Sequence, residues 1–285
     1  MRRVAVILAF AGTVVAGVSI FLVETAFHLA PRYRPAPETA PGMEVSVTAS
    51  DGAVLRGALY RPPASNGKAV LLLHGAGDSR RGMDGFGRFF AANGYLALAA
   101  DSRGHGVSGG DAVTYGIHER GDVRRWADFL ARDQRAGQLF GLGESMGAAI
   151  LIQSLAVENR FRALVAECSF STFREAAAER IPRLTGLPRF AGWPLLEAGF
   201  LYARARYGVD LEAASPEAVL RNATTPVLLI HGLADTRTAP AQSRALHAAN
   251  PRYTELWEVP GAGHTRASLV AAAEFQRRVL AWFSR

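Results

Sequence analysis

The sequence predicts an α/β fold in which a mostly parallel sheet of about eight strands carries helices on both faces. Two patterns support this prediction, and a third feature precedes them. Continuous apolar runs alternate with helical stretches along residues 69–285. Two shorter stretches of alternating polarity surround a Ser-Asp-Gly turn at residues 50–52, which is typical of a β-hairpin. An uncharged, mostly apolar run from Val4 to Val23 precedes both patterns.

The composition excludes several classes of protein. A chain of 285 residues suits one large domain or two modest ones. The formal net charge is +7, but Lys68 is the only lysine and the arginines are scattered, whereas a nucleic-acid-binding surface needs clustered charge. Cys168 is the only cysteine, so the chain can form neither an intrachain disulfide nor a cysteine zinc site.

The N-terminal run is long enough to cross a membrane as a helix. Arg2 and Arg3 precede it, and no small-residue cleavage site follows it clearly. We therefore expect an uncleaved signal anchor over residues 1–30 and a single-pass protein, with the domain outside the cytoplasm. A cleaved signal and a secreted protein are the alternative. Residues 31–42 are rich in proline and predict an extended linker.

The domain itself is expected from residue 43 to residue 285. The predicted hairpin covers residues 44–62, and further strands are expected at 69–75, 95–101, 138–143, 163–168, 226–232 and 253–261. Helices are expected at 86–94, 119–133, 145–160, 241–250 and 268–285. Ligands of such sheets lie at the carboxyl ends of the strands, so the candidate site residues should follow the apolar runs.

The pattern Gly-x-Ser-x-Gly occurs twice, around Ser108 and around Ser145. Ser145 directly follows a predicted strand and precedes a helix without breakers, which is the setting of a nucleophilic serine on a sharp turn. Ser108 lies in a loop with too many glycines to begin a helix. We therefore predict that Ser145 is the nucleophile and that Ser108 is structural.

A nucleophilic serine needs a base and an acidic group that orients the base. His264 lies in a glycine-rich loop after the last predicted strand and is the expected base. Asp235 is the first carboxylate after the strand at 226–232 and is the expected acid, while Glu255 and Glu258 lie within the last strand and are weaker candidates.

The negative oxygen that forms during acyl transfer needs two backbone N–H donors. Met146, the residue after the nucleophile, is expected to supply one. The loop after the first parallel strand should supply the other, from Ala76 or alternatively from Gly77. His74 and the loop around His105 are expected to have structural roles.

The motifs LLLHGAGDS, DSRGHGVSGG, GLGESMGAA, LLIHGLADTRT and PGAGHT together resemble those of serine hydrolases of the α/β-hydrolase superfamily. The resemblance covers the chain from about residue 43 onward and is strongest to the Bem46 group and the serine aminopeptidase-like families. It implies the α/β-hydrolase fold and the triad Ser145, Asp235 and His264. It does not define the substrate.

Residues 170–222 form a longer connection than one crossover helix requires, with aromatic residues between arginines and with Pro182, Pro188 and Pro194 expected to break the helices. The segment predicts either a small helical cap or a packed helix with a surface loop. In the cap interpretation, Phe190, Trp193 and Phe200 line the acyl pocket.

Hydrolysis of a small-molecule carboxylic ester through an acyl-enzyme is the function that these residues favour, with no metal and no organic cofactor. Peptide or amide hydrolysis is the alternative reaction. A tethered binding protein that retains the fold without turnover is the alternative class, against which the complete set of site residues argues.

Overall fold

The computed structural model describes residues 2–28 and 42–285, so the predicted linker falls outside the described residues except for Gly42. Its centre is one eight-stranded sheet with the order β1-β2-β4-β3-β5-β6-β7-β8. The strands are β1 Met43–Thr48, β2 Val54–Tyr60, β3 Lys68–Leu73, β4 Leu96–Ala100, β5 Gln138–Glu144, β6 Phe161–Glu167, β7 Val227–Gly232 and β8 Thr254–Val259. The first two strands pair antiparallel and β3 to β8 are parallel, which confirms the predicted α/β class.

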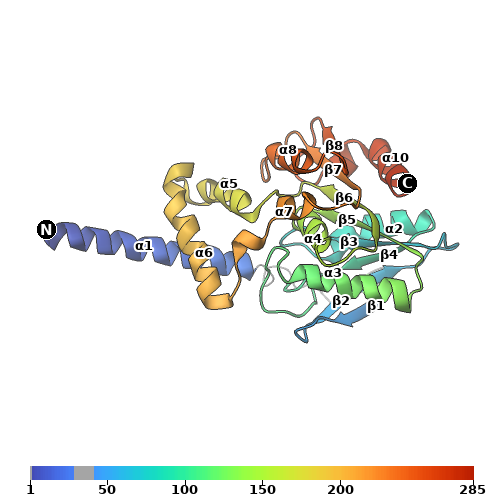
Figure 1. Cartoon of the computed structure of the whole chain (residues 1–285), viewed down its shortest axis with the longest axis horizontal. Coiled ribbons are helices and arrows are strands. Elements are labelled where there is room, and N and C mark those ends of the chain that lie inside the picture. Colours follow the sequence, from blue (N-terminus) through green and yellow to red (C-terminus); the bar gives the residue numbers. More distant parts are fainter. Residues whose placement is uncertain (1, 29–41) are drawn as a thin grey trace.

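Helices cover both faces of the sheet (Figure 1). One apolar core lies between the sheet and a layer that includes α3 and α4, and a second core lies between the opposite face and α2 with α10. The central strands are buried on both faces of the sheet because the side chains that they present to each face are apolar. The helices outside the cap are α2 Asp84–Ala92, α3 Glu119–Asp128, α4 Met146–Ser154, α8 Pro240–Ala249, α9 Ala267–Val270 and α10 Ala272–Trp282, with the short helical turns η2 Arg80–Met83 and η3 Phe129–Asp133.

The connection between β6 and β7 forms a helical cap that stands beside the sheet (Figure 1). Its elements are α5 Phe173–Thr185, η4 Arg189–Gly192, α6 Trp193–Tyr207, η5 Leu211–Ala213 and α7 Pro216–Leu220. The expectation that Pro182 and Pro194 break the helices was wrong. Pro194 lies in the first turn of α6, where its missing N–H is not needed. Pro182 lies in the last turn of α5, so the helix continues through it at the loss of the one backbone hydrogen bond that an N–H at this position would donate to the preceding turn.

Helix α1, Arg2–Phe27, is long and apolar enough to cross a membrane by length and composition. It projects from the end of the domain that carries α5 and α6 (Figure 1). Its C-terminal half belongs to the folded domain, because Phe27 is only 1% exposed and Val23 is buried in the same core. The Ser19 hydroxyl donates to the carbonyl of Leu195 in α6 at 3.0 Å.

Candidate active site

Ser145 occupies a sharp turn between β5 and α4. Its φ is 52° and its ψ is −113°, a backbone conformation that is uncommon for residues other than glycine. The flanking glycines permit it. A Cβ atom on Gly147 would lie 2.3 Å from the carbonyl oxygen of Leu73, and one on Gly143 would lie 2.5 Å from the backbone of Gly147. The turn therefore requires this Gly-x-Ser-x-Gly spacing and presents the hydroxyl above the strand end.

His264 lies between Ser145 and Asp235 and contacts both. The Ser145 Oγ is 2.9 Å from Nε2 of His264, and Nδ1 of the same ring is 2.7 Å from Oδ2 of Asp235. In the neutral tautomer that these contacts favour, Nδ1–H donates to the carboxylate and Nε2 accepts the serine proton. The structure thus brings the three predicted residues, each from a loop at a different strand end, into one hydrogen-bonded chain.

Asp235 is buried but holds a negative charge. Its Oδ1 accepts the backbone N–H groups of Arg237 at 2.7 Å and Thr238 at 3.0 Å. Burial alone would raise the pKa of this carboxyl, but the hydrogen bonds from His231 and His264 outweigh it and the pKa lies well below its ordinary value. Asp235 therefore stays ionised and can stabilise a positively charged imidazole.

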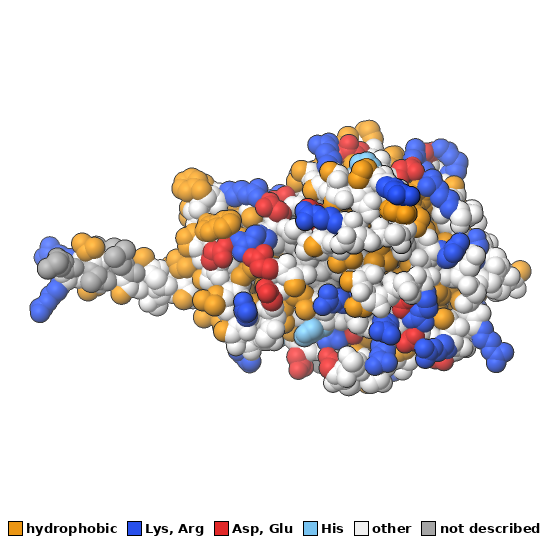
Figure 2. Space-filling model, viewed as in Figure 1, with side chains coloured by type: hydrophobic (Ala, Val, Ile, Leu, Met, Phe, Trp, Pro, Cys, Tyr) orange, Lys and Arg blue, Asp and Glu red, His pale blue; other side chains and the backbone are white. Residues whose placement is uncertain are grey.

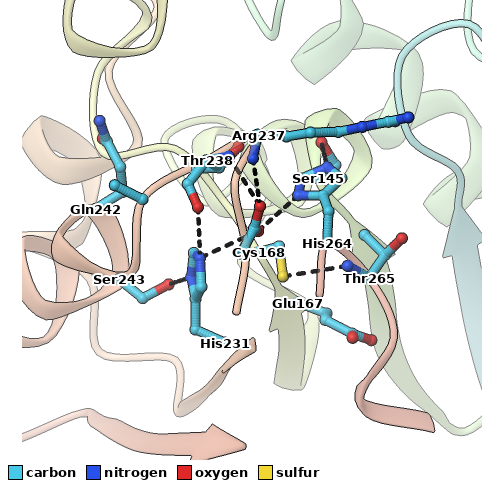
Figure 3. A network of polar contacts seen from close by, with 12 residues as sticks. Ser145, Glu167, Cys168, His231, Arg237, Thr238, Gln242, Ser243, His264 and Thr265 are labelled. Atoms are coloured by element: carbon cyan, nitrogen blue, oxygen red, sulfur yellow. Dashed lines mark hydrogen bonds and ion pairs between the residues drawn. The ribbon is translucent and has the colours of Figure 1, made fainter. Parts of the chain in front are cut away.

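His231, at the end of β7, is a site residue that the sequence reasoning did not identify. Its Nε2 is 3.3 Å from Oδ2 of Asp235 and 3.0 Å from the carbonyl of Thr238, while Nδ1 is 2.6 Å from the Ser243 hydroxyl (Figure 3). Because a carbonyl can only accept, Nε2–H donates to Thr238, with Oδ2 of Asp235 close by, and Nδ1 accepts from the Ser243 hydroxyl. The signal in the sequence that could have identified it is a histidine at a strand end.

The loop after β3 lies directly over Ser145. A Cβ on Gly75 would lie 3.4 Å from that of Ser145. The N–H of Gly77 donates to Nε2 of His105 at 3.1 Å, so this donor is occupied within the protein. Ala76 is therefore the better candidate of the two predicted alternatives, together with Met146 at the start of α4.

Two buried histidines hold this loop. His74 Nε2 accepts the N–H of Ser102 at 3.1 Å while its Nδ1–H donates to the carbonyl of Gly75 at 2.8 Å. Burial lowers the pKa of His74 and lowers that of His105 to about 4. Both rings are therefore neutral acceptors at neutral pH, in agreement with the structural role expected for them.

Ser108 has a structural environment. Its hydroxyl donates to the carbonyl of Asp101 at 2.8 Å and accepts the N–H of Arg56 at 2.8 Å. Both bonds tie its loop to the sheet, and the hydroxyl has no general base among these partners.

Two acidic side chains lie beneath the nucleophile on adjacent strands. Burial and then the charge of Glu167 raise the pKa of Glu144 to about 8, and burial raises that of Glu167 to about 7. The Glu167 Oε1 accepts the N–H of Ala267 at 2.9 Å, while Oε2 is buried and has no partner among the described residues. Glu144 is thus mainly protonated at neutral pH.

The one set of potential metal ligands found in the described part of the chain consists of Cys168, His231 and Asp235, whose ligand atoms lie within 4.8 Å of one another. Each already has protein partners, since the Cys168 sulfur accepts the N–H of Thr265 at 3.4 Å. Burial raises the pKa of the Cys168 thiol and keeps it protonated, which does not suit metal binding.

The three predicted pocket residues differ in their surroundings. Phe190 is 83% exposed and Trp193 is 54% exposed, with the Arg174 guanidinium 5.1 Å from the Trp193 ring centroid. Phe200 is half-buried, and its ring stacks on that of Phe173 at 6.1 Å. Of the three, Phe200 has the surroundings that suit an inner wall.

Parts of the chain are similar to known proteins. The Serine aminopeptidase, S33, family matches residues 64–193. YqkD, an uncharacterized protein of Bacillus subtilis (strain 168), is 30% identical over 176 residues, which represent 61% of this chain and 57% of that protein. The chain therefore matches little more than half the length of this relative.

Solved structures are similar over most of this chain. The esterase Pf2001 of Pyrococcus furiosus superposes with a TM-score of 0.72 at 24% identity, covering 89% of this chain and 98% of the esterase. A hydrolase from Pseudomonas aeruginosa gives a TM-score of 0.63 at 22% identity, covering 86% of this chain and all (100%) of that one. At these identities the likeness establishes a shared fold.

Proposed function

We propose that this chain is a membrane-tethered serine hydrolase of the α/β-hydrolase superfamily that cleaves carboxylic esters. The observation that carries the proposal is the hydrogen-bonded chain from Ser145 Oγ through His264 to Asp235. An activated serine beside two backbone N–H donors is the arrangement that acyl transfer requires.

The reaction begins when Ser145 Oγ attacks the acyl carbon and its proton passes to Nε2 of His264. The N–H groups of Ala76 and Met146 stabilise the negative oxygen of the tetrahedral intermediate. The intermediate collapses, Nε2–H protonates the leaving alcohol, and an acyl-enzyme remains. Water then attacks the acyl carbon, its proton passes through Nε2 back to Ser145, and the carboxylic acid leaves. Asp235 fixes the ring tautomer throughout.

The match to a serine aminopeptidase family favours amide hydrolysis as a second candidate reaction. The two differ in the leaving group, so one panel separates them. Labelling of Ser145 by a fluorophosphonate probe, followed by turnover of p-nitrophenyl esters and not of aminoacyl amides, supports the esterase. Faster turnover of the amides would reassign the protein as a peptidase, and absence of labelling would favour a binding protein without turnover.

The tether is proposed from α1, with residues Arg2 and Arg3 in the cytoplasm and the domain on the other side. The docking of Phe27 and Val23 in the domain core favours retention of the helix over its cleavage. Alkaline phosphatase joined to the C-terminus should be active in intact cells. A fusion protein that is present in normal amount but inactive would reverse the orientation, because the disulfides of the phosphatase do not form in the cytoplasm.

A further inference from the structure

The cap has an exposed apolar surface next to α1. We infer that this surface lies in the bilayer that α1 enters, so that the candidate active site takes acyl esters of membrane lipids as substrates. We call it the cap surface and define it as Leu187, Phe190, Trp193 and Leu201 together with the outward-facing Phe21 of α1. The substrate part of the inference rests on the proposed esterase function, whereas the placement of the cap surface does not.

Helix α1 and the cap form one three-helix unit. Val15, Val18 and Leu22 of α1 pack on a small core made by Ile181 of α5 and Leu195 of α6 with their neighbours. Cap helices and membrane helix therefore cannot be separated without exposing this core.

The docking leaves too little free helix to cross a bilayer. The side chains described between residues 2 and 14 are exposed, and this part of α1 is about 20 Å long at 1.5 Å per residue. The hydrocarbon core of a bilayer is about 30 Å thick. If α1 spans the membrane, part of its docked half, and hence part of the cap beside it, must also lie at bilayer depth.

The cap surface has the composition that this depth requires. Phe190, Trp193 and Leu201 are 83%, 54% and 69% exposed. Figure 2 shows hydrophobic side chains gathered over the end of the domain from which the membrane helix projects. Two charged residues stand among them in the sequence, and both are paired: Glu197 with Arg174, which also stacks on Trp193, and Arg189 with Glu175. Pairing lowers the cost of placing those charges near lipid.

The first charged residue after the apolar run of α1 meets the C-terminal end of α6, whose last turn carries Arg204 and Arg206. In α1 no charged residue occurs between Arg3 and Glu24. The Glu24 carboxylate accepts hydrogen bonds from the hydroxyls of Tyr202 and Tyr207, both at 2.6 Å, near the C-terminal end of α6. Tyrosines are typical of the membrane–water interface. This shared boundary places the beginning of α6, with Trp193, on the bilayer side.

Tryptophan quenching tests the placement. The full-length protein is reconstituted into vesicles of phosphatidylcholine and phosphatidylglycerol whose acyl chains are brominated near the glycerol. Of the other three tryptophans, Trp126 and Trp282 are buried, and Trp257 is half-buried on β8, away from α1 (Figure 1). We therefore expect Trp193 to supply most of the quenched emission and Trp193→Phe to lose most of the quenching. Equal quenching of the wild type and the Trp193→Phe variant would overturn the inference. Concentration-dependent cross-linking that shows Trp193 buried against a second copy of the chain would also overturn it.

A matched pair of variants tests the substrate class. Leu201 on the cap and Leu269 on α9 are both 69% exposed. Leu201→Glu should lower the ratio of activity on vesicle diacylglycerol to activity on soluble p-nitrophenyl acetate about tenfold or more, because a carboxylate resists entry into lipid. Leu269→Glu should leave the ratio unchanged. If activity on acetate persists and the ratio is the same in both variants, the inference is overturned. If the wild-type protein is inactive on every ester, the proposed function is overturned and the substrate class with it.

Discussion

The carbonyl of Phe27, the last residue of α1, accepts a hydrogen bond from the N–H of Val113 at 2.9 Å. The neighbouring carbonyl of Ala26 accepts the hydroxyl of Tyr115, also at 2.9 Å. The end of the apolar helix is therefore fixed to the loop that precedes α3, within the body of the domain. This makes α1 part of the folding unit as well as a candidate anchor.

Phe27 should therefore contribute to folding stability. Phe27→Ala should lower the free energy of unfolding by about 3 kcal/mol or more, because it leaves a cavity in the core. Phe21→Ala is the matched control in the same helix, since Phe21 is 68% exposed and should change stability by less than about 0.5 kcal/mol in detergent. Thermal and urea unfolding in micelles measure both. Similar losses for the two variants would mean that α1 does not dock as described.

The sequence indicated which three residues the structure brings together, but it did not indicate where the apolar helix docks. Ser145, Asp235 and His264 each follow an apolar strand and lie in a loop rich in small residues, so local patterns locate them. The docking of α1 depends on contacts such as that between Ser19 and Leu195, far apart in the chain. A helix that is apolar on every side gives no periodicity from which a docking face could be predicted.

The choice between Ala76 and Gly77 shows a similar limit of sequence patterns. Both belong to one short loop, and the residue that distinguishes them, His105, lies in a different loop. His231 was missed for a related reason: its role depends on Ser243 orienting its ring, which is a tertiary contact.

The two Gly-x-Ser-x-Gly motifs should behave differently on mutation. Ser145→Ala should abolish fluorophosphonate labelling and lower turnover by several orders of magnitude, as loss of a nucleophile does. Ser108→Ala should retain labelling and lose about 1 kcal/mol of stability, because two backbone groups lose their partner. Probe labelling and thermal unfolding of both purified variants decide the matter. An inactive but folded Ser108 variant would reverse the assignment.

His231 is predicted to be a positioning residue that acts through Asp235. Without its hydrogen bond the carboxylate loses one donor, so the pKa of Asp235 should move upward toward its ordinary value. We expect His231→Leu to lower kcat by about 10- to 100-fold with little change in KM, and His231→Gln, which keeps a donor, to recover part of the loss. A purely structural role would give equal losses for both variants, in proportion to their loss of folded protein.

Glu144 should make the protein less stable as pH rises. Its pKa is about 4.5 in the unfolded chain and is raised to about 8 in the folded state. Between these two pH values the unfolded chain releases a proton that the folded protein keeps. The free energy of unfolding is therefore highest below about pH 4.5 and falls progressively up to about pH 8, by at most about 1.4 kcal/mol per pH unit. Glu144→Gln should flatten this decline and raise the melting temperature mainly at the alkaline end. Parallel pH curves for the two proteins would show that Glu144 ionises normally.

Phe200 is the residue through which the cap should affect acyl selectivity. Its ring stacks on Phe173, and Phe173 in turn contacts Phe170 at 6.1 Å, two residues after Cys168 at the end of β6. A row of aromatic rings thus leads from the cap toward the strand ends that carry the site.

Each methylene buried against Phe200 should contribute about 0.8 kcal/mol, so kcat/KM should rise with chain length until the pocket is full. Phe200→Ala should therefore penalise hexanoate and octanoate esters more than acetate. Trp193→Ala, on the exposed cap surface, should leave the chain-length profile of soluble esters unchanged. A profile altered by the Trp193 variant would return that residue to the acyl pocket. Uniform losses for Phe200→Ala at every chain length, with a lower melting temperature, would mean that Phe200 only packs the cap against the domain.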